Sequence, residues 1–233
     1  MPQIKLSSEF LEYLAALPSD ADASEPSSQL PSLINLSKQM GVSVASLREQ
    51  LEVAKALGLI EVRPRLGMRK LPYSFQPAVR QSLAYAISLD WEYFLYFSDL
   101  RDHIEAAYWQ EAAGKLTAQD IAYLKGLLQH AWGKLRGFPI QIPHNEHKQL
   151  HLTIFTKVEN PFVLGLLEAY WEVYEAVGLN LYADYDYLKQ VWSYHQQMVD
   201  AISAGDLEAG YQALMQHKDM LYKRSYTISI AED

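Results

Sequence analysis

Apolar residues recur at spacings of three and four positions along the chain beyond residue 77. This period is typical of α-helices that bury one face, so this part of the chain is predicted to be all helical. The longest continuous segment covers residues 78–116. Breaks at residues 116–120, 137–143, 159–161 and 180–186 contain Gly, Pro, Asn or Asp, and a turn at 204–206 separates the last two segments. The pattern predicts an all-α bundle of about six helices.

The N-terminal part of the chain has a different pattern. Residues 18–32 are rich in Pro and Ser and too poor in apolar residues to pack, which predicts a loop. Two short helices should follow, over residues 32–41 and 43–58, each beginning after a Ser that can cap its first turn and ending at a Gly. The segments 59–63 and 68–71 favour extended structure around a Pro-to-Gly turn. Together these elements predict a helix-turn-helix followed by a β-hairpin wing.

Composition narrows the class of protein. The 233 residues are 49% hydrophobic, include no cysteine and contain no apolar run long enough to cross a membrane. The first residues lack the pattern of a secretion signal, so we expect a cytoplasmic protein that makes no use of a membrane. Two domains are expected, at residues 1–72 and 73–233.

Charge is unevenly distributed over these domains. The formal net charge is -8, but residues 30–70 hold seven Lys and Arg against three Asp and Glu. This local excess of positive charge lies on the predicted winged helix, and it favours a nucleic-acid partner there.

Residues 30–68 resemble the winged helix-turn-helix of GntR-family transcription regulators. The resemblance rests on the opening Leu-Pro-Ser, the turn Met-Gly-Val-Ser, the Leu-Arg-Glu-Gln-Leu of the second helix, the Gly-Leu-Ile-Glu-Val-Arg-Pro strand and a wing glycine. It implies binding to double-stranded operator DNA, with these candidate contacts: Arg48, Arg63, Arg65 and Gly67. Two positions that are usually basic in the family hold Ile34 and Val44, so the operator preference should differ.

Three of the seven histidines, His144, His147 and His151, fall within eight residues. Since residues four apart share a helix face, His147 and His151 can converge, whereas His144 should precede the helix. His195 and His217 lie on the last two predicted helices. A metal site in a helical bundle can be built from two histidines on one helix and one histidine from each of two antiparallel helices. Spacing alone leaves open that these are core or surface histidines, which are more common.

Residues 76–224 resemble the FCD ligand-binding domain of the FadR-type branch of the GntR family. The resemblance implies a divalent-metal site formed by His147, His151, His195 and His217, with His147 at a position where the family has Asp. An all-histidine set should favour zinc or nickel over manganese or magnesium. The resemblance also implies that Arg101, at the start of an Arg-x-x-Ile-Glu sequence, binds the carboxylate of a small organic-acid effector. The alternative role of Arg101 is an ordinary helix ion pair with Glu105.

The sequence therefore predicts a metal- and effector-responsive transcription regulator that binds its operator as a homodimer. Two other classes of function remain open at this point. One is a histidine-site metalloenzyme, a hydrolase or an oxidase. The carboxylate next to the cluster, Glu146, is adjacent to His147 and so points to another side of the helix, unlike the Glu-x-x-His arrangement of di-iron bundles. The sequence also contains no nucleophile or phosphate-loop signature. The other is a winged helix that mediates only protein contacts.

Overall fold

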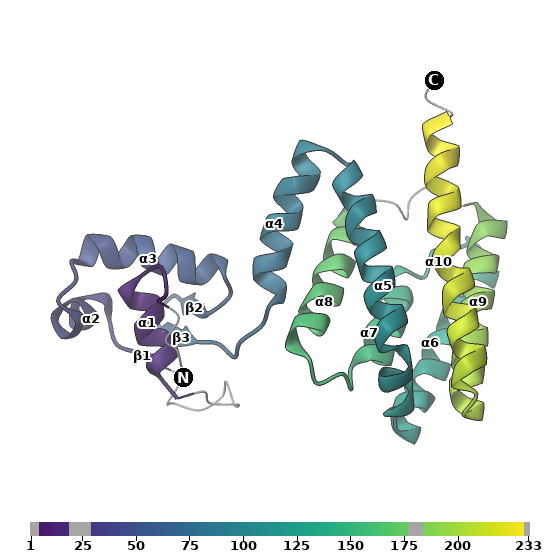
Figure 1. Cartoon of the computed structure of the whole chain (residues 1–233), viewed down its shortest axis with the longest axis horizontal. Helices are drawn as coiled ribbons and strands as arrows, with labels where there is room; N and C mark the ends of the chain where they lie inside the picture. Colours follow the sequence, from purple (N-terminus) through teal and green to yellow (C-terminus); the bar gives the residue numbers. More distant parts are fainter. Residues whose placement is uncertain (1–4, 19–28, 177–183, 231–233) are drawn as a thin grey trace. The chain divides into compact units, whose positions relative to one another are not determined.

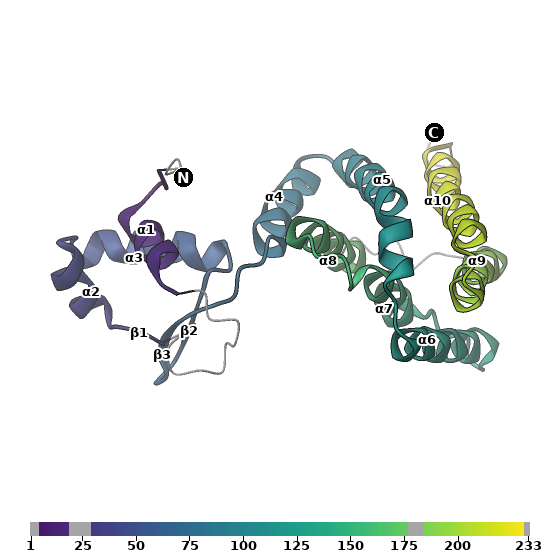
Figure 2. The same ribbon diagram turned by 60° about the horizontal axis from the view of Figure 1, so that its bottom comes forward.

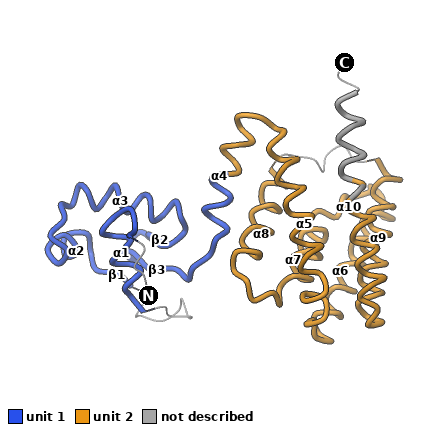
Figure 3. The backbone as a smooth tube through the Cα atoms, in the orientation of Figure 1, with its two compact units in different colours: residues 1–82 blue, residues 83–233 orange. Residues whose placement is uncertain are grey.

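The computed structural model describes residues 5–18, 29–176 and 184–230, and in the last helix it describes side chains as far as Lys218 and at Met220. The chain divides into two compact units, residues 1–82 and residues 83–233 (Figure 3). The division falls within the helix that follows the wing. Each unit has its own buried apolar cluster.

Unit 1 is a winged helix-turn-helix, as the sequence predicts (Figure 1). Its elements are α1 (Glu9–Ala16), β1 (Gln29–Leu30), α2 (Leu33–Met40), α3 (Val44–Ala56), β2 (Ile60–Arg63) and β3 (Gly67–Lys70). The strands form an antiparallel sheet in the order β1-β3-β2. Two features differ from the prediction: α1 was not among the expected elements, and Gln29–Leu30 is a strand rather than loop because it pairs with Met68 and Arg69 of β3.

The helix-turn-helix begins and ends where the sequence predicts. The Ser32 hydroxyl accepts a hydrogen bond from the Asn35 amide, and the Ser43 hydroxyl accepts one from the Ser46 amide, so both helices have side-chain N-caps. Gly41 closes α2 with φ of 71°, a left-handed conformation that is favourable for glycine. These caps fix the tight turn that sets the direction of α3.

Unit 2 is an all-α bundle. The helices beyond the wing are α4 (Gln76–Leu89), α5 (Glu92–Gly114), α6 (Ala118–Arg136), α7 (His144–Phe155), α8 (Pro161–Ala176), α9 (Tyr185–Ala204) and α10 (Leu207–Ile230). They number one more than expected in the described residues, because the segment 78–116 forms two helices. The Asp90 carboxylate accepts a hydrogen bond from the Glu92 backbone amide at 2.9 Å. This bond takes the place of a backbone hydrogen bond of a continuous helix, so the helix is interrupted here.

The other predicted breaks separate helices as expected, apart from residues 180–186, most of which lie outside the described residues. Thr117 forms a capping box with Asp120 at the start of α6, and Gly205 closes α9 with φ of 75°. No helix in the described ranges is long and apolar enough to cross a membrane.

Helix α7 is central in unit 2. It packs against α5, α6 and α8, while α9 and α10 form a hairpin that packs on α6 and α5 (Figure 2). The largest apolar cluster of the chain links these helices through buried residues such as Trp109, Leu150 and Trp192. Because α5, α7, α9 and α10 all contribute to this one core, their inward-facing polar residues can meet inside it.

Candidate metal centre and DNA-binding face

Four histidines meet in the core of unit 2. They are His147 and His151 on α7, His195 on α9 and His217 on α10, and each offers a ring nitrogen that lies within 4.8 Å of those of the others. His151, His195 and His217 are buried, and His147 is partly buried. His144 is outside this group. The expectation that it precedes the helix is wrong, because α7 begins at His144 with Pro143 as its N-cap. We refer to these four residues as the histidine cluster.

Helical spacing and aromatic packing hold the histidine cluster in place. His147 and His151 are one turn apart on α7 with ring centroids 5.2 Å apart, and the His195 and His217 rings are 4.4 Å apart across the α9–α10 hairpin. Trp171 of α8 packs against His147 at 4.6 Å, and Trp192 packs against His195 at 4.8 Å. Neighbouring tryptophans restrict the ring positions and keep the cluster away from solvent.

The separation of two histidines of the cluster suits a single metal ion. The Nε2 atoms of His151 and His195 are 3.1 Å apart. Two nitrogen ligands on one tetrahedral zinc ion are separated by about 3.3 Å, since each Zn–N bond is about 2.0–2.1 Å. The buried Nε2 of His147 and Nδ1 of His217 also have no hydrogen-bond partner in the described part of the chain. Buried donors and acceptors are rarely left unpaired, so these nitrogens fit a site that can bind a metal ion.

The histidines are held in the form that binds metals. Burial, and then the proximity of the other histidines, lower the pKa of His147 and His195 well below the usual value. Burial, followed by His151 and Arg101, has the same effect on the pKa of His217. These three rings are therefore neutral near pH 7, and only a neutral imidazole has a lone pair free for a metal ion.

Glu105 orients the fourth histidine. Its Oε1 lies 3.2 Å from the His151 Nδ1, so the Nδ1–H donates to the carboxylate and the Nε2 lone pair is directed at the cluster. The other oxygen of Glu105 accepts from the Arg101 Nη1 at 3.2 Å. Burial alone would raise the pKa of Glu105, but Arg101 and His151 outweigh it and lower this pKa, which keeps the carboxylate charged.

Arg101 is enclosed in the bundle. Only 5% of its side chain is exposed, and Nη1 also lies 3.1 Å from the Asp102 carboxylate. The guanidinium stacks over the Tyr170 ring, 4.5 Å from its centroid. The ion pair with Glu105 that the helical spacing predicted is present. The Asp102 contact was not predicted, because adjacent helical residues seldom face one another and no periodic signal marks the pair.

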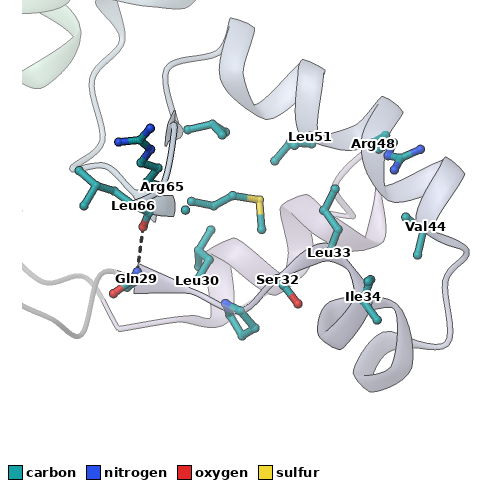
Figure 4. Close-up of a pocket in the computed structure, with 14 residues that line it drawn as sticks. Gln29, Leu30, Ser32, Leu33, Ile34, Val44, Arg48, Leu51, Arg65 and Leu66 are labelled. Carbon is teal, nitrogen blue, oxygen red and sulfur yellow. Dashed lines mark hydrogen bonds between the residues drawn. The ribbon is translucent and has the colours of Figure 1, made fainter.

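The winged helix presents a second candidate site, a groove of about 610 Å³ between α2, α3 and the wing (Figure 4). Of the four predicted DNA contacts, Arg48, Arg65 and Gly67 line this groove, whereas Arg63 does not. The Arg63 Nε donates to Glu61 at 2.8 Å. Arg48 and Arg65 are exposed and form no ion pair within the described residues. Gly67 has φ of 82°, and the Gln29 amide donates to the Leu66 carbonyl at 2.9 Å, which fixes the wing tip.

Comparison with known proteins identifies the family. The pattern of the FCD domain matches residues 97–219, which is more than half of the chain and includes the histidine cluster and Arg101. This chain is a GntR-family transcriptional regulator of the FadR type. The Escherichia coli (strain K12) uncharacterized HTH-type transcriptional regulator YieP is 27% identical to it over 203 residues, which are 81% of this chain and 82% of YieP.

Solved structures of other regulators share the fold. A Streptococcus agalactiae GntR superposes with a TM-score of 0.64 at 16% identity, over 84% of this chain and 89% of that chain. Lar, described as controlling expression of the Listeria monocytogenes agr system, superposes with a TM-score of 0.51 at 14% identity, over 86% and 87% of the two chains. The family and its members named here are transcription regulators, so the metalloenzyme alternative is set aside.

Proposed function

We propose that this GntR-family regulator binds a transition metal at the histidine cluster and senses a small organic acid beside it. The observation that carries the proposal is the convergence of four histidine rings, three of them buried and one partly buried, next to a buried arginine. Apolar side chains at these positions would give a more stable core, because buried nitrogens without hydrogen-bond partners destabilise the folded state.

The donor set points to the kind of metal. Four imidazole nitrogens suit zinc or nickel, while manganese and magnesium prefer oxygen ligands and at least one carboxylate. His147, His151, His195 and His217 would hold the ion, and Glu105 would keep His151 in the correct tautomer. When bound, the ion would supply a positive charge able to attract an anionic oxygen.

Local charge favours an anionic effector. Among the described residues, the buried charged groups beside the histidine cluster are Arg101, Asp102 and Glu105, a net of one negative charge. The half-buried Lys218 acts on Asp102 from α10 but is not one of these buried groups. Adding a divalent cation changes this net to one positive charge, which a single carboxylate would neutralise. Because an unbalanced charge in a low-dielectric interior is unfavourable, metal and organic acid should bind together better than either binds alone.

Arg101 is our candidate for recognition of the acid. Its Nε has no partner in the described residues, so the guanidinium retains one unused donor while Nη1 contacts Asp102 and Glu105. An arginine that stacks on Tyr170 and Trp171 is held in one orientation, which suits a planar carboxylate.

We further propose that the regulator acts in the cytoplasm as a homodimer on operator DNA, with Arg48, Arg63, Arg65 and Gly67 at the DNA. Arg63 would first have to exchange its contact with Glu61 for a phosphate. Exposed apolar residues on unit 2 supply a surface for dimerisation: Tyr85 and Leu89 on α4, and Tyr93, Tyr96 and Leu100 on α5. We name this set the aromatic strip.

Metal analysis tests the central proposal. Purified protein, loaded with zinc or nickel and then desalted, should hold close to one metal ion per chain, and His195→Ala and His217→Ala should each remove it. His144→Ala is the matched control, because this histidine shares α7 with two cluster members but lies outside the cluster. Absence of metal from the wild-type protein after loading would refute the site.

The choice of metal has its own test. His147→Asp restores the residue type of the family at this position, and it should shift preference from nickel and zinc toward manganese in competitive titrations. A thermal-shift screen of carboxylic acids, with and without zinc, should find acids that stabilise the protein more when zinc is present. Acids that act equally without metal would contradict joint binding.

A further inference from the structure

The groove of unit 1 combines positive charge with exposed apolar side chains. Ile34 is 61% exposed and Leu66 is 63% exposed, although both line a face that also carries Arg48 and Arg65. Among the described lining residues there are two arginines and no carboxylate. Burial of these apolar side chains by DNA would be favourable, and the charge of the groove suits a phosphate backbone.

Val44 occupies a position at which such a fold meets base edges, and Ile34 lies beside it. Val44 is the first residue of α3, and Ile34 is the second residue of α2. The N-terminal residues of the second helix in a helix-turn-helix contact bases in the major groove. Arg48 lies one turn after Val44, so the two share a face of α3, and the Val44 and Ile34 side chains lie near each other at one end of the groove (Figure 4).

We propose that Val44 and Ile34 read the 5-methyl groups of thymine, so that each operator half-site carries thymines next to the base pair contacted by Arg48. Thymine is the one base with an apolar group in the major groove, and valine and isoleucine have nothing to offer a hydrogen-bonding edge. Arg48 can pair with guanine through two hydrogen bonds, while Arg65 and Gly67 of the wing approach the neighbouring phosphates.

Recognition of thymine through shape and apolar contact is sensitive to the loss of a single methyl group. Removing one buried methyl should weaken binding about fourfold. The inference concerns the winged helix and requires neither metal nor organic acid to be bound. Failure of the metal analysis would leave it intact.

The experiment uses the full-length protein and a library of random DNA duplexes. The duplex that the protein enriches is resynthesised with deoxyuridine in place of thymidine, one position at a time, and binding is measured by fluorescence anisotropy. One or two positions in each half-site should show about a fourfold loss per methyl. Val44→Ala and Ile34→Ala should bind the thymine duplex more weakly, and each should abolish the methyl dependence at its own position.

Val53→Ala is the matched control. Val53 is an exposed valine on the same helix, but it does not line the groove, since nine residues turn an α-helix by half a revolution from Val44. It should bind both duplexes as the wild type does. The proposal would be overturned if no single replacement of thymidine by deoxyuridine changed the binding affinity. It would also be overturned if Val44→Ala and Ile34→Ala both kept the wild-type loss of affinity at the same positions. Enrichment of no sequence would overturn it as well and would favour a protein partner for the groove.

Discussion

Asp102 is a carboxylate buried between Arg101 and Glu105, with 2% of its side chain exposed. Burial raises the pKa of Asp102 to about 6, because the charge of Arg101 only partly compensates for lost solvation. In the folded protein this acid therefore binds its proton more tightly than in the unfolded chain. The stability due to protonated Asp102 is present below pH ~4 and is lost as the pH rises toward 6.

Asp102→Asn mimics the protonated acid and should stabilise the metal-free protein at pH 8 by roughly 2–3 kcal/mol. At pH 4.5 the advantage should become small, since the wild-type acid is then mostly protonated. Urea unfolding of both proteins in chelator at the two pH values measures the difference. An equal difference at both values would show that Asp102 does not titrate in this range.

Glu105→Gln should weaken zinc binding about 10–100-fold, because the amide is a poorer partner for the His151 Nδ1–H than the carboxylate is. Competition with a chelating dye gives the affinity. Glu111→Gln on the same helix is the control, since Glu111 forms only an exposed pair with Lys115. Equal affinities of Glu105→Gln and wild-type protein would remove Glu105 from the metal site.

Some residues of the candidate site could be predicted from the sequence, and others could not. The four cluster histidines could be predicted from helical spacing together with the family resemblance, and the structure brings them together. The ion pair of Arg101 with Glu105 follows from their separation of four residues. Asp102 and Trp171 could not be predicted, since their roles depend on how α5 and α8 pack and not on local spacing.

Close packing of helices positions the histidines of the cluster. A Cβ at Gly210 of α10 would lie 2.6 Å from the buried Trp109 ring of α5, so a side chain there has no room. The Trp109 indole donates to the Leu207 carbonyl at 2.8 Å, which ties the start of α10 to α5. Since Gly210 precedes His217 by two helical turns, the same contact determines where His217 lies.

Gly210→Ala should destabilise the protein by about 1–3 kcal/mol through overpacking and should also reduce zinc affinity. Gly126→Ala in α6 is the opposite case, because a Cβ there meets no atom within 4 Å and alanine favours the helix. It should stabilise by roughly 0.5–1 kcal/mol without changing zinc binding. Thermal unfolding and zinc titration of both variants test the pair. Stabilisation by Gly210→Ala would contradict the packing argument.

Elements with strong local signals were predictable, and elements set by distant contacts were not. Serine caps and terminal glycines marked α2 and α3 because they act within one turn. The division of residues 78–116 into α4 and α5 was missed, since Asp90 breaks an otherwise continuous apolar pattern by a single side-chain hydrogen bond. Strand β1 was missed because it exists only by pairing with β3 far along the chain.

At the scale of the whole molecule, the aromatic strip should mediate dimerisation. Leu89→Glu together with Leu100→Glu places two charges on it and should convert the dimer to a monomer, with operator affinity falling strongly. Light scattering after size exclusion measures the mass. Tyr123→Glu, an exposed aromatic of α6, is the control and should remain dimeric. A wild-type protein that is monomeric at micromolar concentration would refute the dimer itself.

The two units should be separable by mutation. Arg101→Lys keeps a charge beside Asp102 and Glu105 but loses the planar fork, so the response of DNA binding to the acid should disappear while acid-free DNA binding stays near normal. Arg48→Ala should lose DNA binding and retain metal. The normal response should be about 5- to 100-fold, because coupling between sites is typically about 1–3 kcal/mol. An unchanged response in Arg101→Lys would reject Arg101 as the acid-binding residue.

Glu105 divides its two oxygens between His151 and Arg101. If the metal binds His151 and the acid binds Arg101 as proposed, a shift of either residue disturbs the Glu105 carboxylate, which also holds the other residue. The protein would then work as a coincidence detector, whose output follows the joint presence of two signals more closely than the amount of either. A cell starved of the metal would stop responding to the acid, even when the acid is abundant.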